Sequence, residues 1–140
     1  KDSPFIGEAV CAGCHSEAAK VWNKSRHAHA FATLKKEGKH FDPECLECHV
    51  VGLKPWRAPA DSDPQMKKWE GLVGFLSPDL TSHLMNVQCE NCHGPARAHL
   101  LDPTKKLPVS NPDETCVSCH HGSHSPLFSF EKYWPKVQHK

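Results

Sequence analysis

One five-residue pattern occurs four times in this chain of 140 residues and uses all eight of its cysteines. Each copy has two cysteines separated by two residues and followed at once by a histidine: Cys11-Ala-Gly-Cys14-His15, Cys45-Leu-Glu-Cys48-His49, Cys89-Glu-Asn-Cys92-His93 and Cys116-Val-Ser-Cys119-His120. This is the attachment sequence of c-type haem. Two thiols three positions apart can form thioethers with one porphyrin edge, and the histidine then reaches the iron from one face. We therefore expect four haems c, with His15, His49, His93 and His120 as proximal ligands.

Two other uses of paired cysteines have to be weighed against haem attachment. Paired cysteines can bind zinc, and eight cysteines could form four disulfides. Neither alternative requires a histidine after each pair, so neither explains why all four pairs have one. Haem attachment is the interpretation that accounts for every copy.

The supply of apolar side chains is small for a globular chain. Leu, Ile, Val and Phe together make up about 19% of the residues, close to the level at which composition suggests disorder. The formal net charge is only +1, so the self-repulsion typical of disordered chains is missing. Four porphyrins would supply the buried apolar surface that the chain lacks. We expect a single domain over residues 1–140, wrapped around its haems and unable to fold without them.

Local patterns favour a mainly α fold with extensive loops and little or no β structure. Helical signals cover residues 16–36, with a second stretch from about 26 to 37, then 95–101 and 127–139, the last kinked or restarted near Pro135. Proline-rich segments predict loops at 52–65 and 102–113, and residues 66–88 give weak helical signals. No segment alternates convincingly between apolar and polar residues, as a half-buried strand would.

Charge and hydropathy exclude two classes of partner. The calculated isoelectric point is about 7.8 and there is no basic block, so recruitment of nucleic acid by charge is not expected. The apolar runs are far too short for a membrane span. Thioether attachment of haem takes place outside the bacterial cytoplasm, so we expect a periplasmic or extracellular protein.

Eight histidines remain after the proximal ligands are removed, and they are the candidates for the distal iron ligands. They are His27, His29, His40, His83, His99, His121, His124 and His139. Methionine is the other common distal ligand, but the chain offers only Met66 and Met85. The numbers therefore favour mostly or entirely bis-histidine haems, which have low reduction potentials. His40 and His121 are expected at the surface or beside haem propionates.

Several segments resemble the multihaem cytochrome c-554 family. They include Phe5-x-Gly7, Trp22, the run Ser25-Arg-His27-Ala28-His29-Ala30, Cys48-His49-Val50-x-Gly52, Val87-Gln-Cys89-Glu-x-Cys92-His93-Gly94-Pro95 with His99 following, and Ser125-Pro126-x-Phe128 with Tyr133-Trp134 and His139. The resemblance covers nearly the whole chain, and Cys-Glu-x-Cys-His-Gly-Pro is its most specific element. It implies a secreted tetrahaem electron carrier.

The resemblance also implies three distal ligands. His99 is similar to the distal ligand of the first haem, His139 to that of the third, and His27 to that of the fourth. In the protein that gives the family its name, the second iron is five-coordinate, with lysine at the place held here by His29. Residues two apart on a helix point about 200° apart, so His27 and His29 cannot serve the same iron. We favour His29 as distal ligand of the second haem, with His83, His124 or an open position as alternatives.

Electron transfer between redox proteins is the function that this sequence favours. Four porphyrins within a domain of about 14 Å radius of gyration must lie close together, which allows rapid electron hopping. No catalytic cluster is apparent, so we expect a carrier without catalytic residues. The first alternative is a reductase for a small nitrogen oxide, NO or nitrite, at an open second iron. The second is the protomer of an extracellular filament, in which the chain self-assembles and its haems form a continuous path.

Overall fold

The computed structural model describes residues 3–53, 57–58, 64–109 and 111–140, and within them the chain forms short helices joined by loops. The longest, α2, has nine residues. No strand forms in the described ranges, where Val50 and Met85 pair as an isolated antiparallel bridge. The predicted fold class is therefore confirmed. The helical elements are α1 (Glu8–Ala12), α2 (Ser16–Lys24), η1 (Arg26–His29), α3 (Ala30–Lys36), α4 (Pro43–Leu46), α5 (Pro64–Lys67), η2 (Ser82–Leu84), α6 (Cys89–His93), α7 (Arg97–Leu101), α8 (Pro112–Val117), η3 (Gly122–His124), α9 (Phe130–Tyr133) and η4 (Trp134–Lys136).

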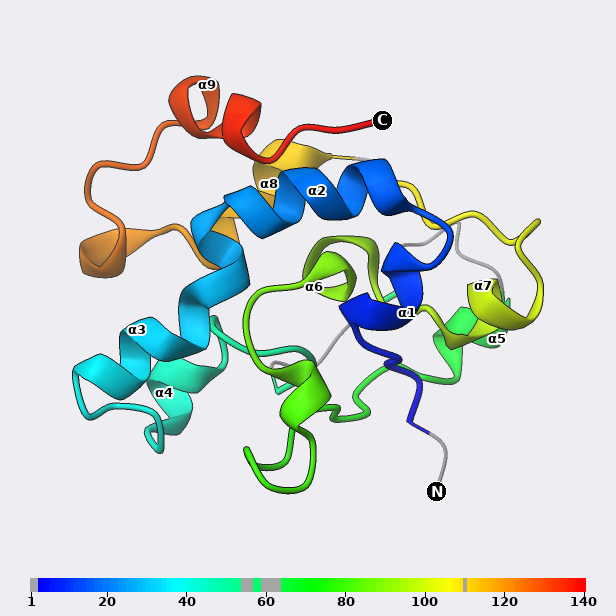
Figure 1. Ribbon diagram of the computed structural model, residues 1–140, viewed down its shortest axis with the longest axis horizontal. Helices are drawn as coiled ribbons and strands as arrows, with labels where there is room; N and C mark the ends of the chain where they lie inside the picture. The colour runs from blue at the N-terminus through cyan, green and yellow to red at the C-terminus, as the bar shows by residue number, and fades with distance from the viewer. Residues whose placement is uncertain (1–2, 54–56, 59–63, 110) are drawn as a thin grey trace.

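The helix α6 lies near the centre of the view in Figure 1, below α2 and beside α1. It packs against α1 on one side and α8 on another, so three of the four cysteine motifs are neighbours. The pair α3 and α4 packs together at the far end of the molecule, where the remaining motif lies.

The predicted helical region at 16–36 is confirmed, but in three pieces. The backbone is extended at Ser25 (φ −89°, ψ 161°), which ends α2 and lets η1 start in a new direction. The last piece, α3, ends at Lys36, and Gly38 follows with φ +70°. This break places the histidines of η1 on a tight helix that is separate from the longer helices on either side.

Prolines shift the boundaries of the other predicted elements. The helix predicted at 95–101 starts only at Arg97, and the one predicted at 127–139 shortens to α9 and η4, with Pro135 inside η4. Pro112 starts α8 inside the predicted loop 102–113, because proline suits the first turn of a helix. Pro64 starts α5 within the predicted loop 52–65, of which residues 54–56 and 59–63 lie outside the described residues.

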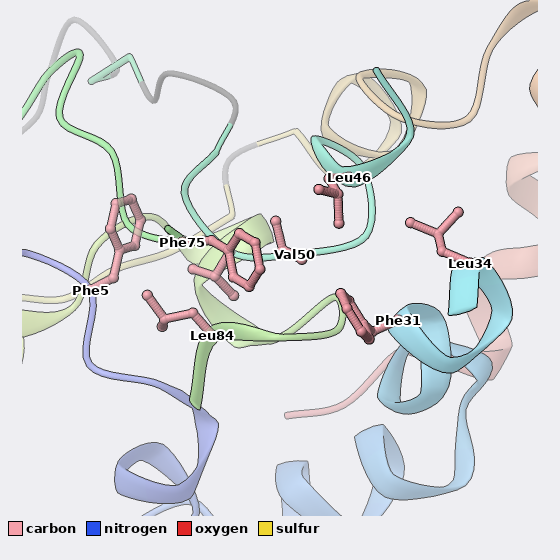
Figure 2. Close-up of a cluster of buried hydrophobic side chains, with 8 residues drawn as sticks. Phe5, Phe31, Leu34, Leu46, Val50, Phe75 and Leu84 are labelled. Carbon is pink, nitrogen blue, oxygen red and sulfur yellow. The ribbon is translucent and has the colours of Figure 1, made fainter. Parts of the chain in front are cut away.

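A cluster of eight buried apolar side chains joins α3 and α4 to three loop segments (Figure 2). Its members are Phe5, Phe31, Leu34, Leu46, Val50, Val51, Phe75 and Leu84. Burying one side chain of this kind contributes about 2 kcal/mol. This cluster packs one part of the molecule, and it includes no residue from α2, α6, α7 or α8.

Three backbone segments, around Val51, Gly74 and Leu84, cross at the middle of this cluster. The amide of Val51 donates to the carbonyl of Leu84 (2.8 Å), and the amides of Phe75 and Gly74 donate to the carbonyls of Val51 (2.9 Å) and Gly52 (2.7 Å). The backbone of Gly52 has φ +81°, and a Cβ there would lie 2.7 Å from the Gly74 nitrogen. The crossing therefore needs glycine at position 52 for both conformation and space.

Polar side chains around the third motif tie α6 to the rest of the fold. Gln88 accepts a hydrogen bond from the Glu8 amide (2.8 Å) and donates to the carbonyls of His83 (2.8 Å) and Met85 (2.6 Å). Asn91 donates to the carbonyl of Val50 (2.8 Å). These side chains bind backbone groups of the preceding turn and of two distant segments, so they fix the position of α6 without a large apolar interface.

We expect Gly52→Ala to lower the free energy of unfolding by about 2–4 kcal/mol, because it adds left-handed strain to a backbone clash. Gly71→Ala is the matched control. Gly71 has φ +77° but open space around its Cβ position, so it should cost about 1 kcal/mol. Guanidinium unfolding of the purified, cofactor-loaded protein measures both values. Equal losses for the two variants would contradict the close approach at Gly52.

Candidate metal-cofactor site

Each of the four cysteine motifs begins on or within a short helix. Cys11 lies in α1, Cys45 in α4 and Cys116 in α8, and α6 contains the third motif entirely. Backbone hydrogen bonds close a helical turn across two of the motifs. The amide of His15 donates to the carbonyl of Cys11 (2.9 Å), and the amide of His120 donates to the carbonyl of Cys116 (2.8 Å). Residues three apart on a helix lie on the same face. Each motif can therefore present two thiols together, as attachment to one porphyrin edge requires.

Three of the four motifs also lie close to one another. The thiols of Cys11 and Cys89 are near enough to share a hydrogen bond, and Cys92 interacts electrostatically with Cys116 and Cys119. Among the described residues no three His, Cys, Asp or Glu side chains converge to hold a metal ion as a zinc site would. None of the eight cysteines is joined to another cysteine in a disulfide.

Three histidine rings from the motifs each face a histidine from a distant segment. The ring centres are 6.1 Å apart for His15 and His99, 6.1 Å for His27 and His120, and 6.2 Å for His93 and His139. Two imidazoles on opposite sides of one metal ion have ring centres about 6 Å apart, because each metal–nitrogen bond is about 2 Å and each nitrogen lies about 1 Å from its ring centre. The three separations fit that geometry. By contrast, the direct stack of His120 on Phe128 measures 4.8 Å.

Hydrogen bonds at Nδ1 orient several of these rings. His93 donates to the carbonyl of Leu107 (2.5 Å), His99 to that of Lys105 (2.9 Å) and His139 to that of Val137 (2.8 Å). A carbonyl can only accept, so the proton of each neutral ring is on Nδ1 and the lone pair is on Nε2. This second-shell arrangement is typical of histidines that bind metals through Nε2.

The environment favours the neutral form of the imidazoles, which is the form that ligates. Burial lowers the pKa of His27, and the nearby rings of His120 and His49 lower it further. Burial also lowers the pKa of His120. Burial is the main cause of the lowered pKa of His93 as well, although its bond to the Leu107 carbonyl acts in the opposite direction. Iron ligation at these positions would not have to displace a proton near neutral pH.

His49 has a different environment from the other three motif histidines. Its Nδ1 donates to the carbonyl of Ala30 (2.8 Å), and no other imidazole pairs with its ring among the described residues. His29, the favoured partner from sequence, is exposed, as are His15 and His139, and it directly precedes Ala30. The backbone next to His29 holds the Nδ1 side of the His49 ring, whereas a distal ligand has to approach from beyond Nε2. The structure also leaves the other two candidates, His83 and His124, exposed.

The remaining sulfur and imidazole candidates pair with no motif histidine. Met66 is buried, and Met85 packs against the apolar cluster. His121 is exposed and bonds through Nδ1 to the carbonyl of Val117 (2.8 Å). The expected surface position is thus observed for His121, whereas His40 is half-buried, between Phe31 and Phe41.

Sequence reasoning missed the groups that support the rings. These are the carbonyls of Leu107, Lys105 and Ala30, together with Ser125, whose hydroxyl lies 2.9 Å from Nδ1 of His120. Every residue has a backbone carbonyl, so the sequence cannot indicate which carbonyls bind the imidazole rings. This applies to three of the four supporting groups.

The exposed surface of the polypeptide fits a chain packed around a large cofactor. The chain exposes 9324 Å², whereas a compact monomer of 15.6 kDa typically exposes about 7,200 Å². Leu101 and Leu127 are 79% and 83% exposed. The thiols, the facing imidazoles and this uncovered apolar surface together are the features that attached porphyrins need.

No helix within the described part of the chain combines the length and apolar character needed to cross a bilayer.

Comparisons with known proteins agree with these features. The family model for cytochrome c554 and c-prime matches residues 10–94. Cytochrome c-554 of Nitrosomonas europaea is 29% identical over 153 aligned residues, which cover 85% of this chain and 58% of that protein, so the chain spans less than two thirds of its length. The solved structure of the reduced state of cytochrome c554 from the same organism has a similar fold, with a TM-score of 0.57 and 24% identity over 99% of this chain and 80% of the other. The chain belongs to the cytochrome c554 family.

Proposed function

We propose that the chain is a tetrahaem c-type cytochrome that carries electrons between redox proteins. The observation that carries this proposal is the set of three imidazole pairs with nearly equal separations of 6.1, 6.1 and 6.2 Å. The family model ends at residue 94, so the fourth motif, His99 and His139 lie beyond it. Their rings lie opposite other histidines in a part of the chain that the family model does not match.

In this proposal the eight cysteines hold four haems and the imidazoles hold the irons. His15 and His99 would ligate the first iron, His93 and His139 the third, and His120 and His27 the fourth, with His49 as the proximal ligand of the second. Bound haem supplies one-electron chemistry through its iron, and bis-imidazole ligation keeps its potential low. The protein fixes the rings through their Nδ1 bonds, so the ligands need little rearrangement when the charge of the site changes.

The positions of the ring pairs relative to one another support electron transfer within the protein. The His15–His99 and His93–His139 pairs influence each other electrostatically, and so do His49 and the His27–His120 pair. Neighbouring sites of this kind favour rapid movement of electrons along the set. The partners would be redox proteins, and the location would be the periplasm or the cell exterior, where thioethers are formed.

The surroundings of His49 favour a second candidate function, the binding or reduction of a small nitrogen oxide. Three of the motif histidines face an imidazole across a metal-sized gap, and His49 faces none in the part of the chain that is described. The Ala30 carbonyl holds the Nδ1 side of the ring, so the Nε2 side is the side on which an iron and an added ligand would lie. This arrangement makes the second iron the place where NO would bind.

We expect mature protein to carry four covalent haems and no free thiol. Intact mass should exceed the polypeptide mass by four haems, and denatured protein should not react with a thiol reagent. Replacing Cys116 and Cys119 by alanine should remove one haem and leave three. A wild-type mass with fewer than four haems would contradict the tetrahaem proposal.

We expect His99→Ala to convert about one quarter of the iron from low spin to high spin, because only the His15 iron loses a ligand. Electron paramagnetic resonance of the oxidised protein measures the fraction. His121→Ala is the matched control, since His121 is exposed and pairs with no other imidazole, and it should leave the spectrum unchanged. An unchanged spectrum in folded His99→Ala protein would contradict the assignment.

We expect oxidised wild-type protein to show one high-spin iron in four and to bind one equivalent of NO. His29→Ala should leave both results unchanged, because in this candidate function the second iron has no distal histidine. Entirely low-spin iron that becomes one-quarter high-spin in His29→Ala would instead establish His29 as the distal ligand of the second haem. In that case the nitrogen-oxide candidate fails while the electron-transfer proposal remains.

A further inference from the structure

Glu90, between the two cysteines of the third motif, is a buried carboxylate with only backbone partners. It is 2% exposed. Its oxygens accept hydrogen bonds from the amides of Ile6 (3.0 Å to each oxygen), Gly7 (2.8 Å) and Ala96 (2.8 Å). In the described parts of the chain no Lys, Arg or His nitrogen lies within 4.0 Å of it. The group is therefore an unpaired acid, stabilised by peptide dipoles.

The hydrogen-bond pattern fits the ionised form of Glu90. Every partner is a donor, and both oxygens are used, so a protonated carboxyl would have to turn its O–H toward an N–H group. Burial raises the pKa of Glu90, and the three amides and the charge of Arg97 oppose that rise. A carboxylate that accepts several backbone N–H bonds is favoured in its charged form. We take the charge as fixed in the folded protein.

The two segments that bind Glu90, together with its own motif, lead to two of the proposed haem sites. Gly7 lies four residues before Cys11, and its carbonyl is 3.5 Å from the Cys11 sulfur. Ala96 lies three residues before His99, the partner of His15. Glu90 itself lies between the cysteines that would anchor the third haem. Its charge thus lies in the protein wall shared by the first and third haem sites.

We propose that Glu90 is a buried negative charge that lowers the reduction potentials of the first and third haems relative to the fourth. The inference rests on the proposed function. Reducing a haem adds one electron, and a negative charge held in a low-dielectric wall opposes that addition. Second-shell hydrogen bonds, net charge and burial are the means by which proteins set haem potentials. Glu90 is then a positioning and tuning residue that orders electron filling within the set.

The test is a potentiometric titration of the four-haem protein followed by haem absorption. In Glu90→Gln, which keeps the shape and removes the charge, two of the four one-electron steps should move to higher potential. Gln88→Ala is the matched control. Gln88 also binds the N-terminal segment, at the amide of Glu8, but its hydrogen bonds are neutral, so its loss should lower thermal stability and leave the potentials in place.

Three results would overturn the proposal: an unchanged titration of folded Glu90→Gln, an equal shift of all four steps, or the same shift in Gln88→Ala. If Glu90→Gln does not fold, Arg97→Gln replaces it, because Arg97 is the cation that acts on Glu90. Its removal should shift the same two steps to lower potential, and unshifted steps would overturn the inference. A wild-type protein that carries fewer than four haems, or whose iron is not mostly low-spin, would refute the proposed function itself. That result is separate from the outcomes for the Glu90 and Arg97 variants.

Discussion

Three pairs of histidine rings, each held at a separation of about 6 Å, are the constraint around which this fold is arranged. Each pair joins a cysteine motif to a segment that is far away in sequence: α1 with α7, α8 with η1, and α6 with the C-terminal residues. Closing loops of this length is entropically costly, so a strong bond between the ends is needed to stabilise them. A shared metal ion between two imidazoles would supply such a bond.

This constraint explains why the helices are short. A helix of four to nine residues is marginal by itself and depends on tertiary contacts. In the part of the chain that the structure describes, an apolar cluster around Val50 and Leu84 includes residues of α3 and α4. Elsewhere apolar residues such as Leu101 and Leu127 are left exposed. Porphyrin faces are the surfaces on which such elements can pack.

The third motif combines attachment with structural support. Gln88, Glu90 and Asn91 bond to backbone groups of the N-terminal segment, the turn at 83–85, and Val50. Hydrogen bonds to a charged group are typically stronger than neutral ones, about 1.5–3 kcal/mol each. A small domain with a limited apolar core can use such bonds to hold its central helix. The charged one of the three, Glu90, is also the residue that we propose lowers the potentials of the first and third haems.

The sequence by itself determined the chemistry of attachment and the helical, loop-rich class of the fold, because a five-residue spacing and local helix signals are contained within a few neighbouring residues. It also indicated, through a family resemblance, which histidines face His15, His93 and His120. Only the tertiary structure decided that the ring of His49 is held by the carbonyl of Ala30, since that contact depends on how the chain turns at Ser25. It also decided that Glu90 is buried against the amides of Ile6 and Gly7, which are distant in the sequence, and that of Ala96. Both are long-range contacts between backbone groups and side chains, and backbone groups are the same at every position, so no local pattern in the sequence could specify them.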